Sequence, residues 1–264
     1  MSNRLALLWQ YRGFILSRVR LEIQGRTKGS VLGLLWLVLP PLAQITVFTV
    51  IFANVMRARL PGVDDGLAYS VFLFSGILAW SLFTEVLTRC QGVFVDYATL
   101  LKKASFPRLC LPVIVSLSAL ANFGILLGLF LIFLLLSGRL SAAVLPGLVP
   151  LVAIELMLAV GLGMILGTLH VFFRDVGHTL NIVLQFWFWL TPIVYPIAIV
   201  PEAVRDVLRL NPLTPVILAW QGLFLEGRLP DWPALLPGFL LASALLFGGY
   251  ALFRRHAEDL VDEL

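Results

Sequence analysis

Charged side chains are scarce in this sequence. Asp, Glu, Lys and Arg make up 13% of its 264 residues, whereas apolar residues make up 60%. A soluble globular domain carries about 25% charged residues, so the composition excludes an ordinary soluble protein. We expect membrane lipids around this chain and no nucleic acid among its partners.

Motifs for nucleotide binding, metal binding and nucleophilic catalysis are missing. The stretch Gly25–Ser30 (GRTKGS) lacks the Gly-x4-Gly-Lys-Ser/Thr spacing that cradles phosphates. The three histidines form no ligand cluster, and no Gly-x-Ser-x-Gly elbow occurs. We therefore expect no catalytic residue, metal or cofactor in this chain. The two cysteines, Cys90 and Cys110, do not indicate a disulfide framework and are expected to be reduced.

Ionisable residues are nearly absent from the apolar stretches. Glu155 is the only charge deep within one of them, and Glu85 lies near the end of another. A proton-coupled carrier needs a chain of such residues, so that class is disfavoured. Two interpretations of Glu155 stay open: a functional intramembrane acid, or an acid that pairs with polar groups inside a helix bundle.

Long uncharged stretches, in contrast, are abundant. Val31–Met56 has no charged side chain, and about 20 apolar helical residues cross a bilayer core. Five further spans are predicted, the fifth of them broken by Pro192 and Pro196: Leu67–Leu87, Leu109–Ser137, Ala142–Phe173, Thr179–Val200 and Pro233–Phe253. The predicted fold class is an all-α integral membrane protein with six transmembrane helices, in which residues 31–264 form one membrane domain.

The basic residues indicate the orientation. Six spans place both termini on one side, and 13 of the 19 Lys and Arg residues fall on that side. Because cytoplasmic loops carry the excess of positive charge, both termini are predicted to be cytoplasmic.

Residues 1–30 form a separate basic segment before the first span. Leu5, Leu8, Trp9, Leu16, Val19 and Ile23 share one broad helical face, which Arg12 interrupts. This pattern suits a helix lying in the cytoplasmic interface, with its basic residues toward anionic headgroups. A basic flank that merely orients the first span is the alternative.

Two connecting segments are unusual. Cys90–Arg108 mixes apolar and basic residues and predicts a short cytoplasmic helix that needs a partner. Thr191–Trp232 is cut by six prolines yet contains apolar sequence such as Leu213–Leu225. Two short helices that re-enter the membrane from outside fit this pattern, because broken backbone is tolerated where protein or a wet cavity covers it. A cap of interfacial helices remains the alternative.

Aromatic residues recur on two spans. Tyr69, Phe72, Gly76, Trp80 and Phe83 share one helical face. Trp187 and Trp189 crowd the fifth span, and Tyr195 lies between its two prolines. One interpretation of these faces is a path for a ligand, because flat aromatic rings can pack against a ligand where leucine would serve lipid contact equally well. An interfacial aromatic belt and core packing are the alternatives.

Several motifs occur in a specific order along the chain. These are Gly29–Trp36 followed by Pro40, Leu101–Arg108 (LKKASFPR) followed by Leu111-Pro112, Phe172–Val176 (FFRDV), Thr191–Pro196 (TPIVYP) and Leu210–Pro215 (LNPLTP). In this order they resemble the permease subunit of type-2 ABC exporters for polysaccharides, the O-antigen, capsule and teichoic-acid permeases. The resemblance covers nearly the whole chain.

The resemblance implies a transport subunit rather than an enzyme. It implies a homodimer in the bacterial inner membrane, two separate ATPase subunits that carry Mg-ATP, and lipid-linked glycan as cargo. With that cargo, we expect the aromatic residues of the two spans to line the transport path, because flat rings pack against the C–H face of a sugar. Leu5–Gln24 would be the interface helix, Asp96–Arg108 the coupling helix, and Pro192–Leu225 the external re-entrant helices. Candidate residues for ATPase coupling are Asp96, Tyr97, Lys102, Lys103, Phe106, Pro107, Arg108, Arg174 and Asp175.

Other cargoes and classes stay open. The same fold could export drugs or small lipids, and a membrane enzyme acting on lipid-linked sugars is a more distant alternative. Gly124 and Gly128, like Gly163 and Gly167, are four residues apart and permit close helix approach. Such pairs more often pack within one chain than between two.

Overall fold

The computed structural model describes residues 9–27, 35, 39, 42–43, 46–47, 67–103, 107–142, 144–257 and 259–263. The predicted first span, Val31–Met56, falls almost entirely outside these residues. All regular secondary structure in the described part is helical.

Four described helices are long and apolar enough to cross a membrane: α4 (Ala68–Asp96), α6 (Cys110–Leu136), α7 (Val144–Phe172) and α11 (Trp232–Arg255). They match the second, third, fourth and sixth predicted spans. Helix α4 continues unbroken to Asp96, past Leu87, where the second span was predicted to end. The drop in hydropathy after Leu87 comes from residues such as Gln91, which is buried against the protein and therefore does not end the helix.

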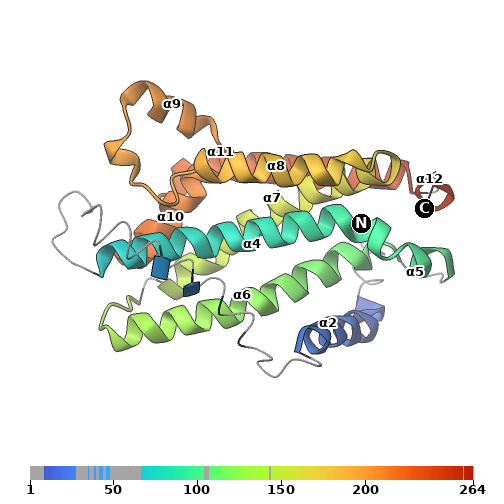
Figure 1. Cartoon of the computed structure of the whole chain (residues 1–264), viewed down its shortest axis with the longest axis horizontal. Helices are drawn as coiled ribbons and strands as arrows, with labels where there is room; N and C mark the ends of the chain where they lie inside the picture. The colour runs from blue at the N-terminus through green and yellow to red at the C-terminus, as the bar shows by residue number, and fades with distance from the viewer. Residues whose placement is uncertain are drawn as a thin grey trace.

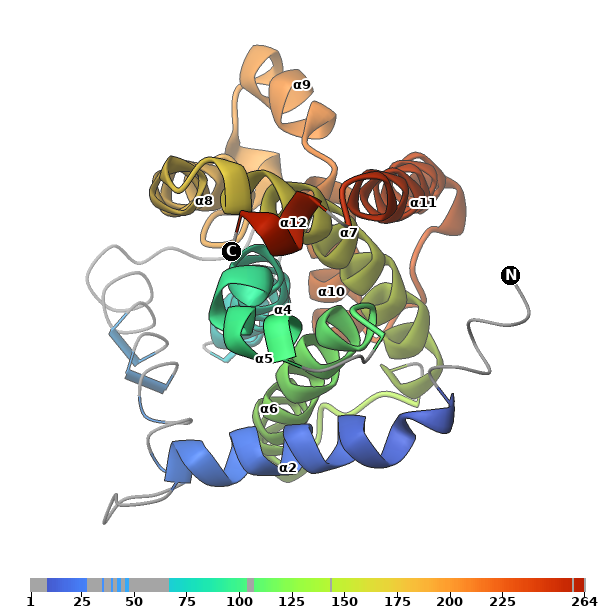
Figure 2. The same ribbon diagram turned by 90° about the vertical axis from the view of Figure 1, so that its right-hand side faces the viewer.

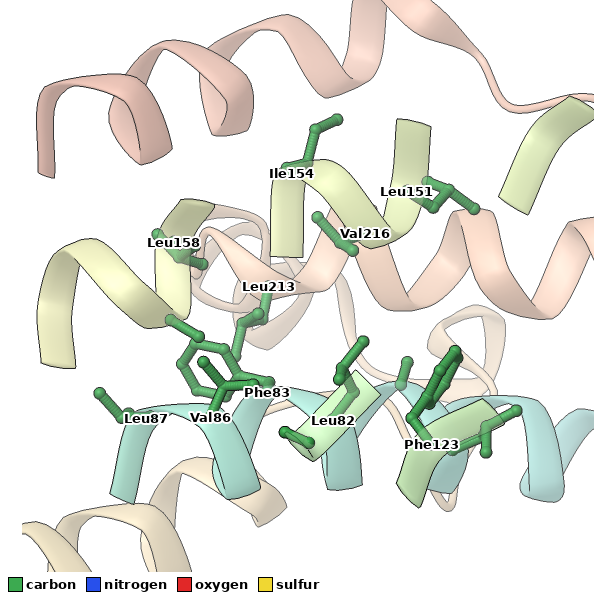
Figure 3. Packing of buried hydrophobic residues seen from close by; sticks show 14 of the residues in the cluster. Leu82, Phe83, Val86, Leu87, Phe123, Leu151, Ile154, Leu158, Leu213 and Val216 are labelled. Atoms are coloured by element: carbon green, nitrogen blue, oxygen red, sulfur yellow. The ribbon is translucent and has the colours of Figure 1, made fainter. Parts of the chain in front are cut away.

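Helix α4 forms the centre of the bundle. It packs against α7, α6 and the shorter α10 (Leu213–Leu225), while α7 packs in turn against α11. Phe83, Val86 and Leu87 of α4 are fully buried, and Figure 3 shows Phe83 and Val86 pointing toward α7 and α10, where Leu158 and Leu213 lie. The apolar faces of α6 and α11 that point away from the bundle are exposed on the single chain, as at Leu136 and Phe247, and suit contact with lipid.

The shorter helices gather at the two ends of the bundle (Figure 1). One end holds α2 (Arg12–Thr27), α5 (Ala98–Lys103) and α12 (Asp259–Asp262). The other end holds α9 (Glu202–Leu210), the 3-10 turn η2 (Ile197–Ile199) and α10. Figure 2 shows α2 lying across the bundle direction, and it packs against α6.

Helix α2 confirms a helix near the N-terminus, and of its two ends only the C-terminal one can be compared within the described residues. The expected range Leu5–Gln24 was wrong at its C-terminal end, because the helix continues to Thr27. Ile15 is buried against the bundle, whereas Trp9 and Leu16 are 70% and 61% exposed. The apolar residues therefore divide between the protein and the surroundings, which a single-face pattern did not anticipate.

The fifth predicted span, Thr179–Val200, differs from the helix observed there. Helix α8 covers Asp175–Trp189, and its 15 residues extend only about 22 Å. It ends before Pro192, because the residue preceding a proline is disfavoured in the α conformation and proline itself offers no N–H group. The chain then turns back into the described bundle.

Glycines bring α7 and α11 into backbone contact. A Cβ atom added to Gly249 would lie 2.5 Å from the carbonyl oxygen of Gly161, and one added to Gly161 would lie 2.4 Å from the backbone nitrogen of Leu246. Gly163 and Gly167 pack in the same way against Cys90 of α4, whereas Gly124 and Gly128 face open space. The first of the two predicted glycine pairs, Gly124 and Gly128, therefore makes no close contact with a described helix, and the second packs within one chain.

We predict that Gly249→Ala lowers the thermal stability of the purified protein, because the two backbones must separate. Overpacking of this kind costs about 1–3 kcal/mol. The neighbouring Gly248 meets no atom within 4 Å, so Gly248→Ala is the matched control and should leave the melting temperature unchanged or slightly higher. Equal melting temperatures for the two variants would contradict the close contact between α7 and α11.

Candidate functional site

The segment after α8 contains backbone carbonyls that no helix satisfies. Inside a bilayer such groups need partners within the protein, and side chains supply them. Tyr69 of α4 donates from its hydroxyl to the Val194 carbonyl at 2.9 Å, and Gln221 of α10 donates to the Pro192 carbonyl at 2.9 Å. Tyr195 donates to the Trp189 carbonyl at 2.8 Å. The turn is therefore fixed against both α4 and α10.

Asn211 connects the end of α8 to the start of α10. Its Oδ1 accepts from the indole N–H of Trp187 at 2.9 Å and from the backbone N–H of Leu213 at 3.0 Å. Its Nδ2 donates to the Leu190 carbonyl at 3.1 Å and to the Thr191 hydroxyl at 2.9 Å. One amide thus satisfies four polar groups at a helix break.

We predict that Asn211→Ala destabilises the protein by about 3 kcal/mol, because it leaves several half-buried polar groups unpaired. Asn181→Ala is the control: Asn181 is exposed on α8, and the bond it donates there is to the Gly177 carbonyl of its own helix. Thermal unfolding in nanodiscs should separate the two variants clearly, and an unchanged melting temperature for Asn211→Ala would be inconsistent with the linking role.

A groove of about 650 Å³ runs between α4 and α8. We call it the α4–α8 groove, and it is lined by Ile77, Trp80, Ser81, Thr84, Glu85, Thr88, Asn181, Leu184, Gln185, Phe188 and Trp189. Indole and phenyl rings alternate there with hydroxyl, amide and carboxylate groups. Such a surface can stack against the apolar face of a ligand and exchange hydrogen bonds with its polar edge.

The structure divides the predicted aromatic residues into two groups. Trp80 and Trp189 line the α4–α8 groove. Tyr69, Phe72 and Phe83 are instead buried within the chain, and Tyr195 and Trp187 hold the turn after α8. Trp187 also contacts Phe83 edge-on, with ring centroids 5.4 Å apart. The contacts that these five residues make within the chain therefore correspond to core packing, one of the two alternatives to lining a path.

Sequence reasoning missed the polar lining of the groove. Thr84 and Thr88 follow Trp80 at intervals of four on α4, and Gln185 follows Asn181 by four on α8, so each set shares a helical face. The hydroxyls of Thr84 and Thr88 donate to carbonyls one turn earlier at 2.8 and 2.6 Å, which leaves each oxygen as an acceptor. The four-residue spacing was a signal that could have identified these residues.

Glu155 lies in α7 and is completely buried. It is close to the indole N–H of Trp220 in α10, but neither group makes a well-formed hydrogen bond within the described residues. The pairing expected of a structural acid is therefore not complete in this conformation. Glu155 does not line the α4–α8 groove.

The predicted coupling residues lie at the end of the bundle that holds α5. Asp96 ends α4, Tyr97 caps it, and the exposed Lys102 lies on α5. The exposed Arg174 and Asp175 form the α7–α8 turn at the same end. Pro107 and Arg108 precede α6 and are half-buried, whereas Phe106 and the side chain of Lys103 lie outside the described residues.

This arrangement, a helical membrane bundle with small helices at the α5 end, agrees with a family comparison. The ABC-2 type transporter family matches residues 15–225. The chain belongs to that family. The expectation of a type-2 ABC permease is therefore confirmed, and with it a transport subunit rather than an enzyme.

Individual relatives extend the match beyond the family region. The chain is 31% identical to an O-antigen export system permease protein of Myxococcus xanthus over 97% of each chain. It is 31% identical to one of Klebsiella pneumoniae over 79% of this chain and 78% of the relative. A polysialic acid transport protein of Escherichia coli is 23% identical over 91% of this chain and 92% of the relative.

Proposed function

We propose that this chain is the membrane-spanning subunit of an ATP-driven exporter that moves lipid-linked polysaccharide across the bacterial inner membrane. The observation that carries the proposal is the similarity to an O-antigen export permease over 97% of both chains. The polysialic acid transport relative is a second protein whose name refers to a glycan polymer.

The α4–α8 groove supports a carbohydrate cargo. Trp80, Phe188 and Trp189 offer ring faces for the C–H side of sugars, while Gln185 and Glu85 offer partners for hydroxyl groups. Each contact of this kind is weak. A moving polymer requires sites that bind and release, and a shallow groove with mixed lining meets that requirement better than a closed pocket.

The α5 end is proposed to face the cytoplasm and to contact the ATPase subunits, which would bind Mg-ATP. The exposed Lys102 of α5 and the exposed Arg174 and Asp175 of the α7–α8 turn lie at this end. Because α2 and α12 lie there too, both termini would be cytoplasmic and the number of crossings would be even. It would be six if the predicted span Val31–Met56 and the segment of α8 each cross the membrane beside the four long helices.

A second copy of the chain is proposed to close the groove. On the single chain α8 exposes Ile182, Phe186 and Trp189 beside the polar residues that line the groove, so the groove would open toward lipid unless another chain covered it. Pairing of two such faces would place the two grooves around one shared path. Helix–helix contact in a membrane depends on close packing of this kind.

The external end is proposed to contain one re-entrant helix. Helix α10 is apolar and largely buried against α4 and α7, as a segment dipping into the membrane must be. Helix α9 carries Glu202, Arg205, Asp206 and Arg209 and projects from the bundle (Figure 2). We assign α9 to the external surface, where its charges reach water.

The proposed function predicts that a strain lacking this gene accumulates lipid-linked glycan on the cytoplasmic side and loses surface glycan. Expression of the chain together with its ATPase subunit should restore both, as measured by immunoblotting and by extraction of the lipid-linked pool. Normal surface glycan with loss of drug or small-lipid efflux would favour the alternative cargo instead.

We expect different outcomes from alanine substitutions at two neighbouring aromatic residues, Trp80 in the groove and the buried Phe83. Trp80→Ala should reduce glycan export about 2–10-fold at unchanged protein level, because one weak stacking contact is lost. Phe83→Ala should instead lower the protein level, since Phe83 is fully buried and its truncation costs about 3–5 kcal/mol. Phe247→Ala, on the exposed face of α11, is the control. Unchanged export in Trp80→Ala would exclude Trp80 from the path.

A further inference from the structure

A chain of polar side chains runs from α2 through α4 to α6. Glu22 of α2 forms an ion pair with Arg89 of α4, and the hydroxyl of Tyr97 donates a hydrogen bond to the same carboxylate. These residues lie far apart in the sequence, and each is only partly exposed. Tyr97 caps α4, and α5 begins at the next residue. Glu22 is thus tied both to α4 and to the base of α5.

Arg89 extends this series of polar contacts toward the α4–α8 groove. Its other terminal nitrogen lies 3.6 Å from a carboxylate oxygen of Glu85, one helical turn earlier. The second oxygen of Glu85 accepts a hydrogen bond of 2.9 Å from Asn122 of α6. Glu85 is also the acid that lines the groove. One guanidinium therefore stands between an acid on the α2 helix and an acid of the groove.

The pKa values of Glu22 and Tyr97 favour the charged and hydrogen-bonded form of these contacts. Burial opposes ionisation of Glu22, but hydrogen bonds from Tyr97 and Arg89 hold its pKa below the ordinary value. Burial, together with the hydrogen bond to Glu22, raises the pKa of Tyr97 to about 12. Glu22 is therefore an anion and Tyr97 a donor across the physiological range.

The geometry is unequal on the two sides of Arg89. The contact with Glu22 is short and hydrogen-bonded, whereas the contact with Glu85 is a longer ion pair. All three side chains are 20–23% exposed, so water screens their interaction less than it would on an open surface. A displacement of Glu22 relative to α4 must change how strongly Arg89 holds Glu85.

We propose that Arg89 is a positioning residue that links movement of the α2–α5 end to the carboxylate of Glu85 in the groove. The inference rests on the proposed function, in which the ATPase acts at the α5 end and the glycan occupies the groove. Because Tyr97 adjoins α5 and bonds to Glu22, a push on α5 moves Glu22, Arg89 follows its partner, and the restraint on Glu85 changes. Glu85 then gains or loses freedom to accept hydrogen bonds from sugar hydroxyls.

Arginine suits this position for a geometric reason. Its planar fork presents separate N–H groups to the two acids at once, and one nitrogen of Arg89 faces each acid. A lysine has a single ammonium group and keeps the charge without spanning both partners. Arg89→Lys therefore tests the link rather than the charge.

The test is a double-mutant cycle in the complete complex of this chain with its ATPase subunit. Arg89→Lys, Glu22→Gln and the double variant are compared with wild type for glycan export per ATP hydrolysed and for melting temperature. Glu22 does not line the groove, so an effect of Glu22→Gln on export has to act through its contacts. Arg20→Lys, at an exposed position of α2, controls for changes to basic residues of that helix.

We expect each single variant to lower export per ATP on the order of tenfold, with little change in melting temperature. The double variant should lose no more than either single variant, because both interrupt one connection. Independent, additive losses would overturn the proposal. So would losses that follow the melting temperature, since they would mean that Arg89 only anchors α2. Wild-type complex that exports no glycan would refute the proposed function, whereas a normal wild type with normal single variants would refute the link alone.

Discussion

Hydrogen bonds to the backbone between Trp189 and Val194 determine how the rest of the bundle is arranged. In a bilayer this interrupted segment has no water to satisfy its carbonyls, so Tyr69, Gln221, Tyr195 and Asn211 do so. The bonds from Tyr69, Gln221 and Asn211 also join this segment to other parts of the chain. Together they attach α10 to the end of α8 and place α8 beside α4, which creates the α4–α8 groove.

Close backbone contacts stabilise the opposite side of α4. Gly163 and Gly167 let α7 approach the backbone of α4, and Gly161 and Gly249 let α11 approach α7. Lipid tails are as apolar as the helix side chains, so apolar burial alone hardly favours one arrangement of helices over another. Close packing of small residues therefore contributes more to this arrangement than hydrophobicity does. The tight α4–α7–α11 layer is a firm support, and the more open α4–α8 side is free to hold a ligand.

Hydropathy and prolines predicted much of the fold. Four of the six predicted spans correspond to long helices, because an uncharged run of sufficient length has few other uses. Pro192 correctly predicted a break, since proline acts on the backbone locally. The extension of α4 to Asp96 was missed because Gln91 is polar but faces protein, and hydropathy does not distinguish lipid from a protein neighbour.

The site was harder to predict because periodicity identifies a face but not what the face contacts. Tyr69, Phe72, Trp80 and Phe83 do share a helical face, yet only Trp80 reaches the groove, and the other three are buried. Bonds such as Glu22 to Arg89 join residues 67 positions apart, and no local pattern specifies them. The family resemblance supplied the cargo class, which neither composition nor spacing contains.

Glycan is proposed to pass along the α4–α8 groove, and photo-crosslinking in exporting cells can detect it there. A photoreactive amino acid placed at Gln185 in the groove should capture glycan in cells that are actively exporting it, giving an adduct that anti-glycan serum detects. The same amino acid at Leu240, on the exposed face of α11, should capture none. Adducts at Leu240 but not at Gln185 would contradict the assignment of the groove as the export path.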